Sequence, residues 1–282
     1  MNDNKVRIYQ ANQFVRMGFF RVWASMGADL IRSSALGWRL FLRDFQSRYR
    51  QQIFGVLWVV IGPFIAVLTY ALLARDNVLN INGIGVPYPI YAYLGFTFWS
   101  LVQGIITNES AVMNMSGSFI KQINFSRESL LISPLLTSLV DLSIKVVMFA
   151  LLCLYYAHYI SPFRVVYLFL LIPALLFALG LGMVFAVVGA VVKDVANLLT
   201  YFFQFLLLVT PVMYPYPSGS FVATLASYNP FYYLTVVPRD LCLYGRSDMM
   251  AAYGVASIVA VLIFLAGWRF YKVSMSRIVE KI

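Results

Sequence analysis

Asp141 and Lys145 have residue types and a spacing that could do chemistry inside a membrane, because they stand four positions apart in an otherwise uncharged stretch. On a helix this spacing places the acid and the base on one face, in the favourable order. The pair is either a self-neutralised contact facing the helix bundle, which we favour, or a proton or ion relay, which usually needs more than one pair. Glu109 lies at the inner end of another apolar stretch, where we expect it to reach the membrane interface or to take part in gating.

Motifs for catalysis are missing from the sequence. The phosphate-binding pattern GxxxxGK[ST] does not occur, and neither does the dipeptide Gly-Lys. His158 is the single histidine, and the two cysteines, Cys153 and Cys242, lie far apart without a CxxC pattern. We therefore expect no ATP hydrolysis, no cofactor, no metal site and no disulfide framework in this chain, and we predict that it is not an enzyme.

The composition is that of an integral membrane protein. Of the 282 residues 61% are hydrophobic and 11% are charged, whereas soluble domains carry about 25% charged residues. A net charge of +10 in such a protein indicates basic cytoplasmic loops rather than nucleic-acid binding.

The apolar stretches predict an all-α fold with six transmembrane helices. The first has 22 residues, about 33 Å of helix, enough to cross a hydrocarbon core of about 30 Å. With both termini in the cytoplasm, 16 of the 21 lysines and arginines lie on the inner side, in agreement with the positive-inside rule. The predicted spans are Ile53–Ala74, Tyr88–Thr107, Leu130–Tyr156, Val165–Val192, Val195–Tyr214 and Met249–Trp268.

These spans divide the chain into a cytoplasmic N-terminal segment, residues 1–52, and a transmembrane domain, residues 53–282. Within the first segment, Gly37–Arg50 projects as an amphipathic helix. Trp38, Leu42, Phe45 and Tyr49 fall on one line of this helix, with Phe41 at the edge, beside a basic line. We favour a helix lying in the membrane interface over a solvated basic face packed on the protein's own loops. The basic residues of interest are Arg39, Arg43, Arg48 and Arg50.

Two connections between spans differ from simple loops. On the inner side, Ser116–Ser129 mixes apolar and charged residues, and Ser116 and Ser118 are candidate caps of a short surface helix. On the outer side, prolines cut Pro215–Asp248 into apolar pieces too short to span, Phe221–Ser227 and Phe231–Val237. Short apolar helices at membrane depth must be buried in protein or line a cavity, so we predict re-entrant helices before the last span.

Aromatic and small residues repeat at helical spacing in several spans. Phe54 with Trp58, and Tyr201 with Phe205, form aromatic faces of the kind that stack on sugar rings, although ordinary helix packing explains them equally well. The same holds for Tyr91, Leu94 and Phe98. A face of small residues predicts close helix contact in the fourth span. Its members are Gly180, Gly182, Ala186 and Gly189.

Four segments resemble membrane subunits of ABC exporters for cell-surface polysaccharides, the O-antigen, teichoic acid and capsule permeases. In order they read RDFQSRYRQQIFGVLWVVIGP (Arg43–Pro63), KQINFSRESL (Lys121–Leu130), VVKDVANLLTYFFQFLLLVTPVMYP (Val191–Pro215) and NPFYYLTVVPRDLCLYG (Asn229–Gly245). Ser126 stands where the family usually has proline. The resemblance covers nearly the whole chain and is less specific for the cargo than for the family.

The resemblance implies a subunit that forms a homodimer, binds two copies of a separate ATPase carrying ATP and Mg, and sits in the bacterial inner membrane. Ser116–Ser129 is then the helix that couples to the ATPase, and the amphipathic helix is a gate at the inner mouth. The channel is lined by the first and fifth spans, at Phe54, Trp58, Tyr201 and Phe205. The coupling residues are Ser116, Phe119, Ile120, Lys121, Phe125, Arg127 and Glu128.

The implied cargo is a lipid-linked polysaccharide, with O-antigen favoured over teichoic acid and capsule. The four arginines of the gate either hold its diphosphate or only anchor the chain among lipid headgroups. Three alternatives remain open. These are an ABC exporter of a drug or small lipid, an ion-coupled transporter using Asp141, Lys145 and Glu109, and a membrane enzyme of glycan assembly, against which the lack of an acidic metal-binding loop argues.

Overall fold

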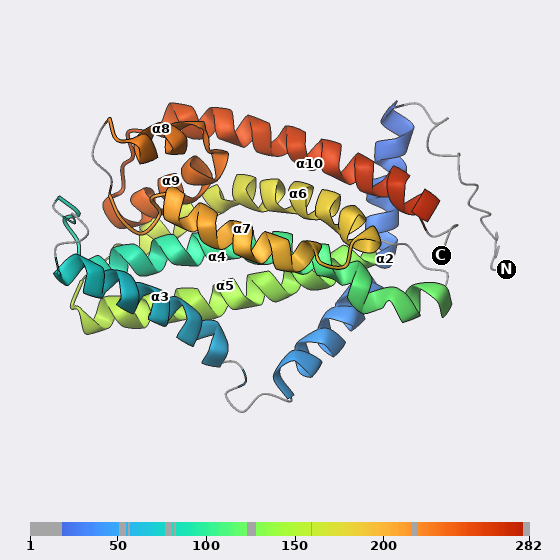
Figure 1. The fold of residues 1–282 in the computed structure, drawn as a ribbon, viewed down its shortest axis with the longest axis horizontal. Helices are drawn as coiled ribbons and strands as arrows, with labels where there is room; N and C mark the ends of the chain where they lie inside the picture. Colours follow the sequence, from blue (N-terminus) through green and yellow to red (C-terminus); the bar gives the residue numbers. More distant parts are fainter. Residues whose placement is uncertain are drawn as a thin grey trace.

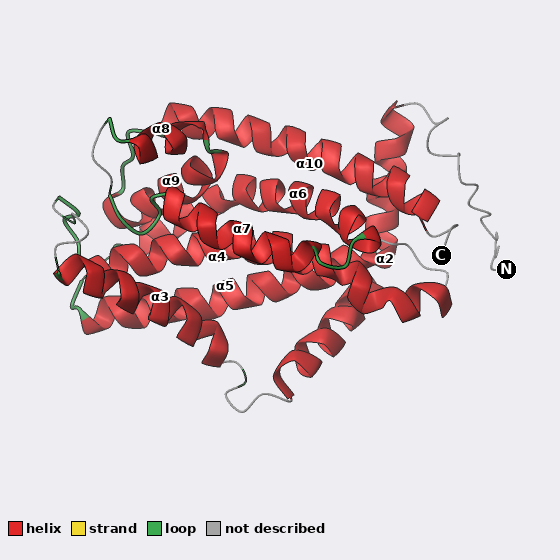
Figure 2. Ribbon diagram, viewed as in Figure 1, coloured by secondary structure: helices red, strands yellow, loops and turns green. Residues whose placement is uncertain are grey.

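The computed structural model describes residues 19–50, 55, 57–76, 81, 83–122, 128–158, 160–215 and 219–278. Every regular element in these ranges is a helix and none is a strand (Figure 1; Figure 2), which confirms the predicted all-α fold. The elements are α2 (Phe19–Arg50), α3 (Leu57–Arg75), α4 (Tyr88–Gln122), α5 (Ser129–Tyr155), η1 (Pro162–Leu171), α6 (Ile172–Val191), α7 (Val195–Val209), α8 (Phe221–Tyr228), α9 (Pro230–Tyr244) and α10 (Met250–Ile278).

Five described helices are long and apolar enough to cross a membrane, and α7 is a shorter apolar helix of 15 residues. The five spans are Leu57–Arg75, Tyr88–Val112, Ser129–Tyr155, Phe163–Val191 and Met250–Met275. The first span was predicted to be helical from Ile53, and this prediction is wrong at Gly55. Gly55 forms a turn with φ +46°, a conformation that glycine adopts without steric cost. Residues 51–54 and 56 lie outside the described residues, so α3 is seen from Leu57.

Helix α4 occupies the middle of the bundle, where it contacts α3, α5, α6, α7 and α9. An aromatic cluster fills the centre: Trp99 lies 6.0 Å from Phe203 and 5.9 Å from Phe231 between ring centroids, and Phe177 lies 4.8 Å from Phe231. These rings meet at tilted or edge-on angles, the geometry that aromatic pairs prefer. Phe98, Tyr91 and Leu94 are also buried, so ordinary packing is the correct interpretation of that predicted aromatic group.

Glycines bring α6 against both of its neighbours, as the small-residue face predicted. A Cβ at Gly189 would lie 2.2 Å from the carbonyl oxygen of Ser110 in α4. On the α10 side, a Cβ at Gly180 would lie 2.7 Å from the backbone of Ile263, and one at Gly267 would lie 2.2 Å from the carbonyl oxygen of Gly180. The absence of side chains therefore lets the three backbones touch, and this packing fixes α10 relative to α4 through α6.

Replacing Gly267 by alanine is expected to lower the free energy of unfolding by about 1–3 kcal/mol, because the methyl group would overlap the backbone of α6. Gly254 is the matched control, since it lies on the same helix and has no atom within 4 Å of its Cβ position. Thermal unfolding of the two variants in detergent tests the difference. Equal stability of Gly267→Ala and Gly254→Ala would contradict the close contact.

The connection between α7 and α10 forms two helices, α8 and α9, at the places predicted for short helices (Figure 1). Helix α9 packs on α4, η1 and α10, and its side chains from Leu234 to Leu243 are almost all buried. The predicted break at Pro238 is wrong, because α9 continues through this proline to Tyr244. The helix tolerates Pro238 because its neighbours bury it: the proline removes one helical hydrogen bond but leaves the packing of the segment intact.

Candidate functional site

Helix α2 extends over 32 residues, longer than the predicted amphipathic run, and packs on α5. A Cβ at Gly37 would lie 2.6 Å from Cδ1 of Ile132, so the two helices touch closely there. Phe41 is 5% exposed and faces the protein, whereas Trp38 and Leu42 are exposed. The buried face of α2 therefore differs from the predicted apolar line. Phe41, predicted at the edge of that line, packs against the bundle, whereas Trp38 and Leu42, predicted at its centre, are exposed.

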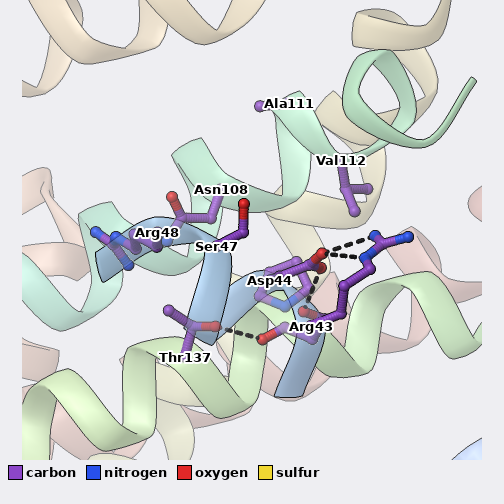
Figure 3. Close-up of a pocket in the computed structure, with 10 residues that line it drawn as sticks. Arg43, Asp44, Ser47, Arg48, Asn108, Ala111, Val112 and Thr137 are labelled. Atoms are coloured by element: carbon purple, nitrogen blue, oxygen red, sulfur yellow. Dashed lines mark hydrogen bonds and ion pairs between the residues drawn. The ribbon is translucent and has the colours of Figure 1, made fainter. Parts of the chain in front are cut away.

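Polar contacts join α2 to α5 beyond this apolar contact (Figure 3). Ser133 Oγ donates a hydrogen bond to Oδ2 of Asp44 over 2.8 Å, and Arg43 donates two bonds, of 2.9 and 2.6 Å, to Oδ1 of the same carboxylate. One turn further along α2, Arg48 Nη1 lies 3.4 Å from Oδ2 of Asp141. The second half of α2 is therefore held to α5 by two acidic residues, one on each helix.

A cavity of about 560 Å³ lies between α2, α4 and α5 (Figure 3). Its polar lining combines two guanidinium groups, three hydroxyl groups and one amide, which can donate hydrogen bonds to phosphate oxygens, with the carboxylate of Asp44, which only accepts them. The larger part of the lining is apolar. The lining residues are Arg43, Asp44, Ser47 and Arg48 from α2, Asn108, Ala111 and Val112 from α4, and Ser133, Pro134 and Thr137 from α5.

Two of the predicted gate arginines, Arg43 and Arg48, line this cavity. Arg39 is exposed on α2, and the side chain of Arg50 lies outside the described residues. The structure thus brings together two of the four residues and adds Asp44, Asn108 and Ser133, which the sequence analysis did not single out.

Asp141 and Lys145, the acid–base pair of the third predicted span, lie next to a basic residue of α2. Asp141 contacts Arg48, and Lys145 donates a hydrogen bond of 2.8 Å to Ser100 of α4. Asp141 and Lys145 also interact electrostatically. The favoured self-neutralised pair is therefore one part of a larger group, because α2 supplies a second cation, Arg48, to the carboxylate of Asp141.

Glu109 does not reach the interface, so that prediction is wrong. Its side chain is fully buried between α4 and α6, and a Cβ at Gly182 would lie 2.2 Å from its Oε2. Neither carboxylate oxygen has a hydrogen-bond partner among the described residues. The missing side chain of Gly182 is the physical reason for its position, because it leaves room for the carboxyl group.

Residues 116–122 of the predicted coupling segment continue α4 instead of starting a separate helix, and residues 123–127 lie outside the described residues. Ser116 and Ser118, predicted as caps, lie inside α4, which runs unbroken to Gln122. Figure 1 shows the end of α4, in green, at the same end of the bundle as the end of α10, in red. The side chains of Ser116, Phe119, Ile120 and Lys121, and all of Phe125 and Arg127, lie outside the described residues.

Glu128, the last predicted coupling residue, is buried and forms an ion pair with Lys272 of α10. Lys272 also pairs with Asp29 of α2, at 3.0 Å. The sequence analysis missed this three-residue network. Its members lie 144 and 243 positions apart, so no local spacing signals the contact.

Three predicted channel residues lie on exposed faces. Trp58 of α3 is 51% exposed, and Tyr201 and Phe205 of α7 are 69% and 63% exposed, while Phe54 lies outside the described residues. Tyr70 of α3 stacks on Tyr214, which follows the end of α7, with centroids 6.2 Å apart.

Comparison with known families identifies the architecture. Residues 36–241, well over half of the chain, match the family model described as ABC-2 type transporter. The chain belongs to the ABC-2 type transporter family. Among curated proteins, a search found no match. The matched residues run from the second half of α2 to α9, so they include the cavity and the whole predicted coupling segment.

Membership in the ABC-2 type transporter family confirms several predictions. The chain is a multi-pass membrane subunit and is not itself an enzyme, because nucleotide binding in these transporters resides in a partner ATPase. Pairing with an ATPase subunit accounts for the missing phosphate loop. The cargo is not specified by the family.

Proposed function

We propose that this ABC-2 transporter subunit forms a homodimer that exports a lipid-linked polysaccharide, with O-antigen favoured, across the bacterial inner membrane. Two copies of the partner ATPase drive the cycle, both chain termini face the cytoplasm, and residues 116–129 receive the movement. The resemblance to polysaccharide exporters supports this cargo class, and no activity is required of the chain itself.

The cavity between α2, α4 and α5 is the observation that carries the proposal. A lipid-linked glycan presents a diphosphate at the boundary between its lipid and its sugar, and Arg43 and Arg48 supply the planar donors that bind phosphate oxygens well. The apolar side chains of Ala111, Val112 and Pro134 border the same cavity. A headgroup that is anionic and attached to a lipid matches this mixed lining.

The exposed aromatic faces of α3 and α7 support the dimer. Tyr201 and Phe205 are exposed within one copy of the chain, and a second copy meeting it along these helices would cover them or form a cargo path with them. Tyrosine and phenylalanine rings on such a path would stack on sugar rings without binding them tightly. Transport through the proposed channel therefore requires no covalent step.

The complex with its ATPase partner, purified together and placed in lipid nanodiscs, tests the function. Addition of a polyprenyl-diphosphate-linked O-antigen oligosaccharide is expected to stimulate ATP hydrolysis, and a cationic dye is expected to leave it unchanged. Stimulation by the dye and not by the glycan would favour the exporter of a drug or small lipid. The genes beside this one give a further test, since glycosyltransferase genes support a glycan cargo and resistance genes do not.

Ion-coupled transport is the second candidate, favoured by the buried carboxyl of Glu109. An ionised carboxylate without a partner is costly at this depth, and a neutral side chain of the same shape avoids the cost. If ATP alone drives export, Glu109→Gln is expected to leave transport and protein abundance unchanged. Vesicle transport driven by ATP or by a proton gradient alone measures this. Lost transport in a well-folded Glu109→Gln variant, or transport without ATP, would favour ion coupling.

A further inference from the structure

Lys272 connects three helices at the inner end of the bundle. Its ammonium group lies 3.0 Å from Oδ2 of Asp29 on α2 and also contacts Oε1 of Glu128, at the start of α5. The side chains of Lys272, Asp29 and Glu128 are only 11%, 9% and 2% exposed. We refer to these three residues as the inner ion network.

The three members of the inner ion network belong to three parts of the molecule that have different roles in the proposed transport cycle. Glu128 directly follows the segment 116–127, and α5 begins at the next residue. Asp29 lies in the first half of α2, and the second half of the same helix carries Arg43 and Arg48 at the cavity. Lys272 lies near the inner end of α10, which the glycine contacts fix to α6.

Burial makes this connection hard to break. Two carboxylates and an ammonium group placed out of water keep their charges only while they remain in contact, and separating one partner leaves an uncompensated buried charge. A surface ion pair would exchange with water freely and would transmit little. The three helices are therefore expected to move together at this contact whenever any of them moves.

We propose that Lys272 is a positioning residue that transmits the movement of segment 116–129 to the gate helix α2. This inference rests on the proposed function, since it requires the ATPase to act on that segment. Movement at Glu128 passes through Lys272 to Asp29, and α2 carries it to the arginines of the cavity. The network thus joins the ATPase side of the subunit to its cargo site without passing through the α2–α5 contacts at Asp44 and Asp141.

A distance measurement that needs no cargo tests the transmission. Spin labels are placed at Gln46→Cys on α2 and Asn197→Cys on α7, two exposed positions outside the cavity lining, so that the second label lies on a helix outside the inner ion network; the buried Cys153 and Cys242 are replaced by alanine. The complex with its ATPase partner is compared in nanodiscs without nucleotide and with ATP and vanadate. We expect the distance to change in this labelled parent.

Asp29→Asn removes the negative charge of the α2 arm, and with it the ion pair to Lys272, and keeps the contact between Lys272 and Glu128. We expect this variant to hydrolyse ATP as the parent does but to lose the nucleotide-dependent distance change. Lys272→Arg, which keeps the charge, and Asp76→Asn, which neutralises an exposed acid at the end of α3, are expected to retain it. A normal distance change in Asp29→Asn would overturn the inference, and so would an unresponsive parent.

Cross-linking separates transmission from a loss of folding. In this experiment the two spin labels are attached first, through unnatural amino acids that do not react with maleimides. The double variant Asp29→Cys, Lys272→Cys is then expected to lose the distance change. It should regain the change when a bis-maleimide joins the two thiols. A well-folded, cross-linked complex that stays unresponsive would overturn the inference. Stimulation of ATP hydrolysis by the glycan is measured separately in the parent. Stimulation together with a normal distance change in Asp29→Asn would contradict the inference alone, whereas absence of stimulation would contradict the proposed function.

Discussion

Replacing both Arg43 and Arg48 by glutamine is expected to reduce export by more than about tenfold while membrane insertion stays normal. Each hydrogen bond to a charged group contributes about 1.5–3 kcal/mol, and 1.4 kcal/mol corresponds to a factor of ten. Both guanidinium groups line the cavity, so a bound diphosphate would lose two such partners together. The measurement is the amount of surface polysaccharide per folded transporter, together with the orientation of the N-terminus.

Insertion should not depend on these two charges, because seven other lysines and arginines remain in the first 50 residues. The double lysine variant keeps both charges without the planar fork, and we expect partial export from it. Arg75→Gln, at the exposed end of α3, is the matched control and should export normally. Lost insertion with normal export per inserted molecule would contradict cargo binding and leave headgroup anchoring as the role of the arginines.

The spans of this protein were predictable because their signal is local. A run of about twenty apolar residues must cross the bilayer as a helix whatever its neighbours are. The third span was predicted at Leu130–Tyr156 and is found at Ser129–Tyr155, and the sixth was predicted to start at Met249 and starts at Met250. Two departures are the turn at Gly55 and the fifth span, which was predicted at Val195–Tyr214 and ends as a helix at Val209.

The rotation of each helix was not predictable, because it is decided by residues far away in the chain. Phe41 was placed at the edge of an apolar stripe, and its burial follows from the contact of Gly37 with Ile132 on α5. Glu109 was expected at the interface, and the space left by Gly182 on α6 holds it inside. The period of a helix gives its faces but not the neighbour that each face meets.

The candidate site shows the same division between local and distant information. Basic residues on one face of α2 were visible in the sequence, so Arg43 and Arg48 were found. Asp141, the acidic partner of Arg48, was assigned to Lys145 alone, because four residues separate those two and 93 separate Arg48 from Asp141. Lys272 carried no signal beyond its position in a basic tail.

Arg239→Gln is expected to lower the free energy of unfolding by about 3–5 kcal/mol, the range for breaking a buried ion pair. Arg239 is buried in α9, where Nη2 lies 2.7 Å from Oδ1 of Asp240 and Nη1 donates a hydrogen bond to the carbonyl oxygen of Val212. Its guanidinium carbon also lies 4.0 Å from the centroid of the Tyr91 ring on α4. Glutamine would leave the Asp240 carboxylate without this cation and would lose the cation–π contact.

The guanidinium group stays charged in this buried position. Burial alone lowers the pKa of Arg239, but Tyr91 and Asp240 outweigh it and raise the pKa above the ordinary value. The ion pair therefore persists across the whole working pH range, and the loss in Arg239→Gln should not depend on pH above the titration of carboxylates. Unfolding in a detergent titration, followed by tryptophan fluorescence, measures the free energy. Arg246→Gln is the matched control, since Arg246 is an exposed arginine just beyond the same helix, and equal stability of the two variants would show that Arg239 does not hold α9 in place.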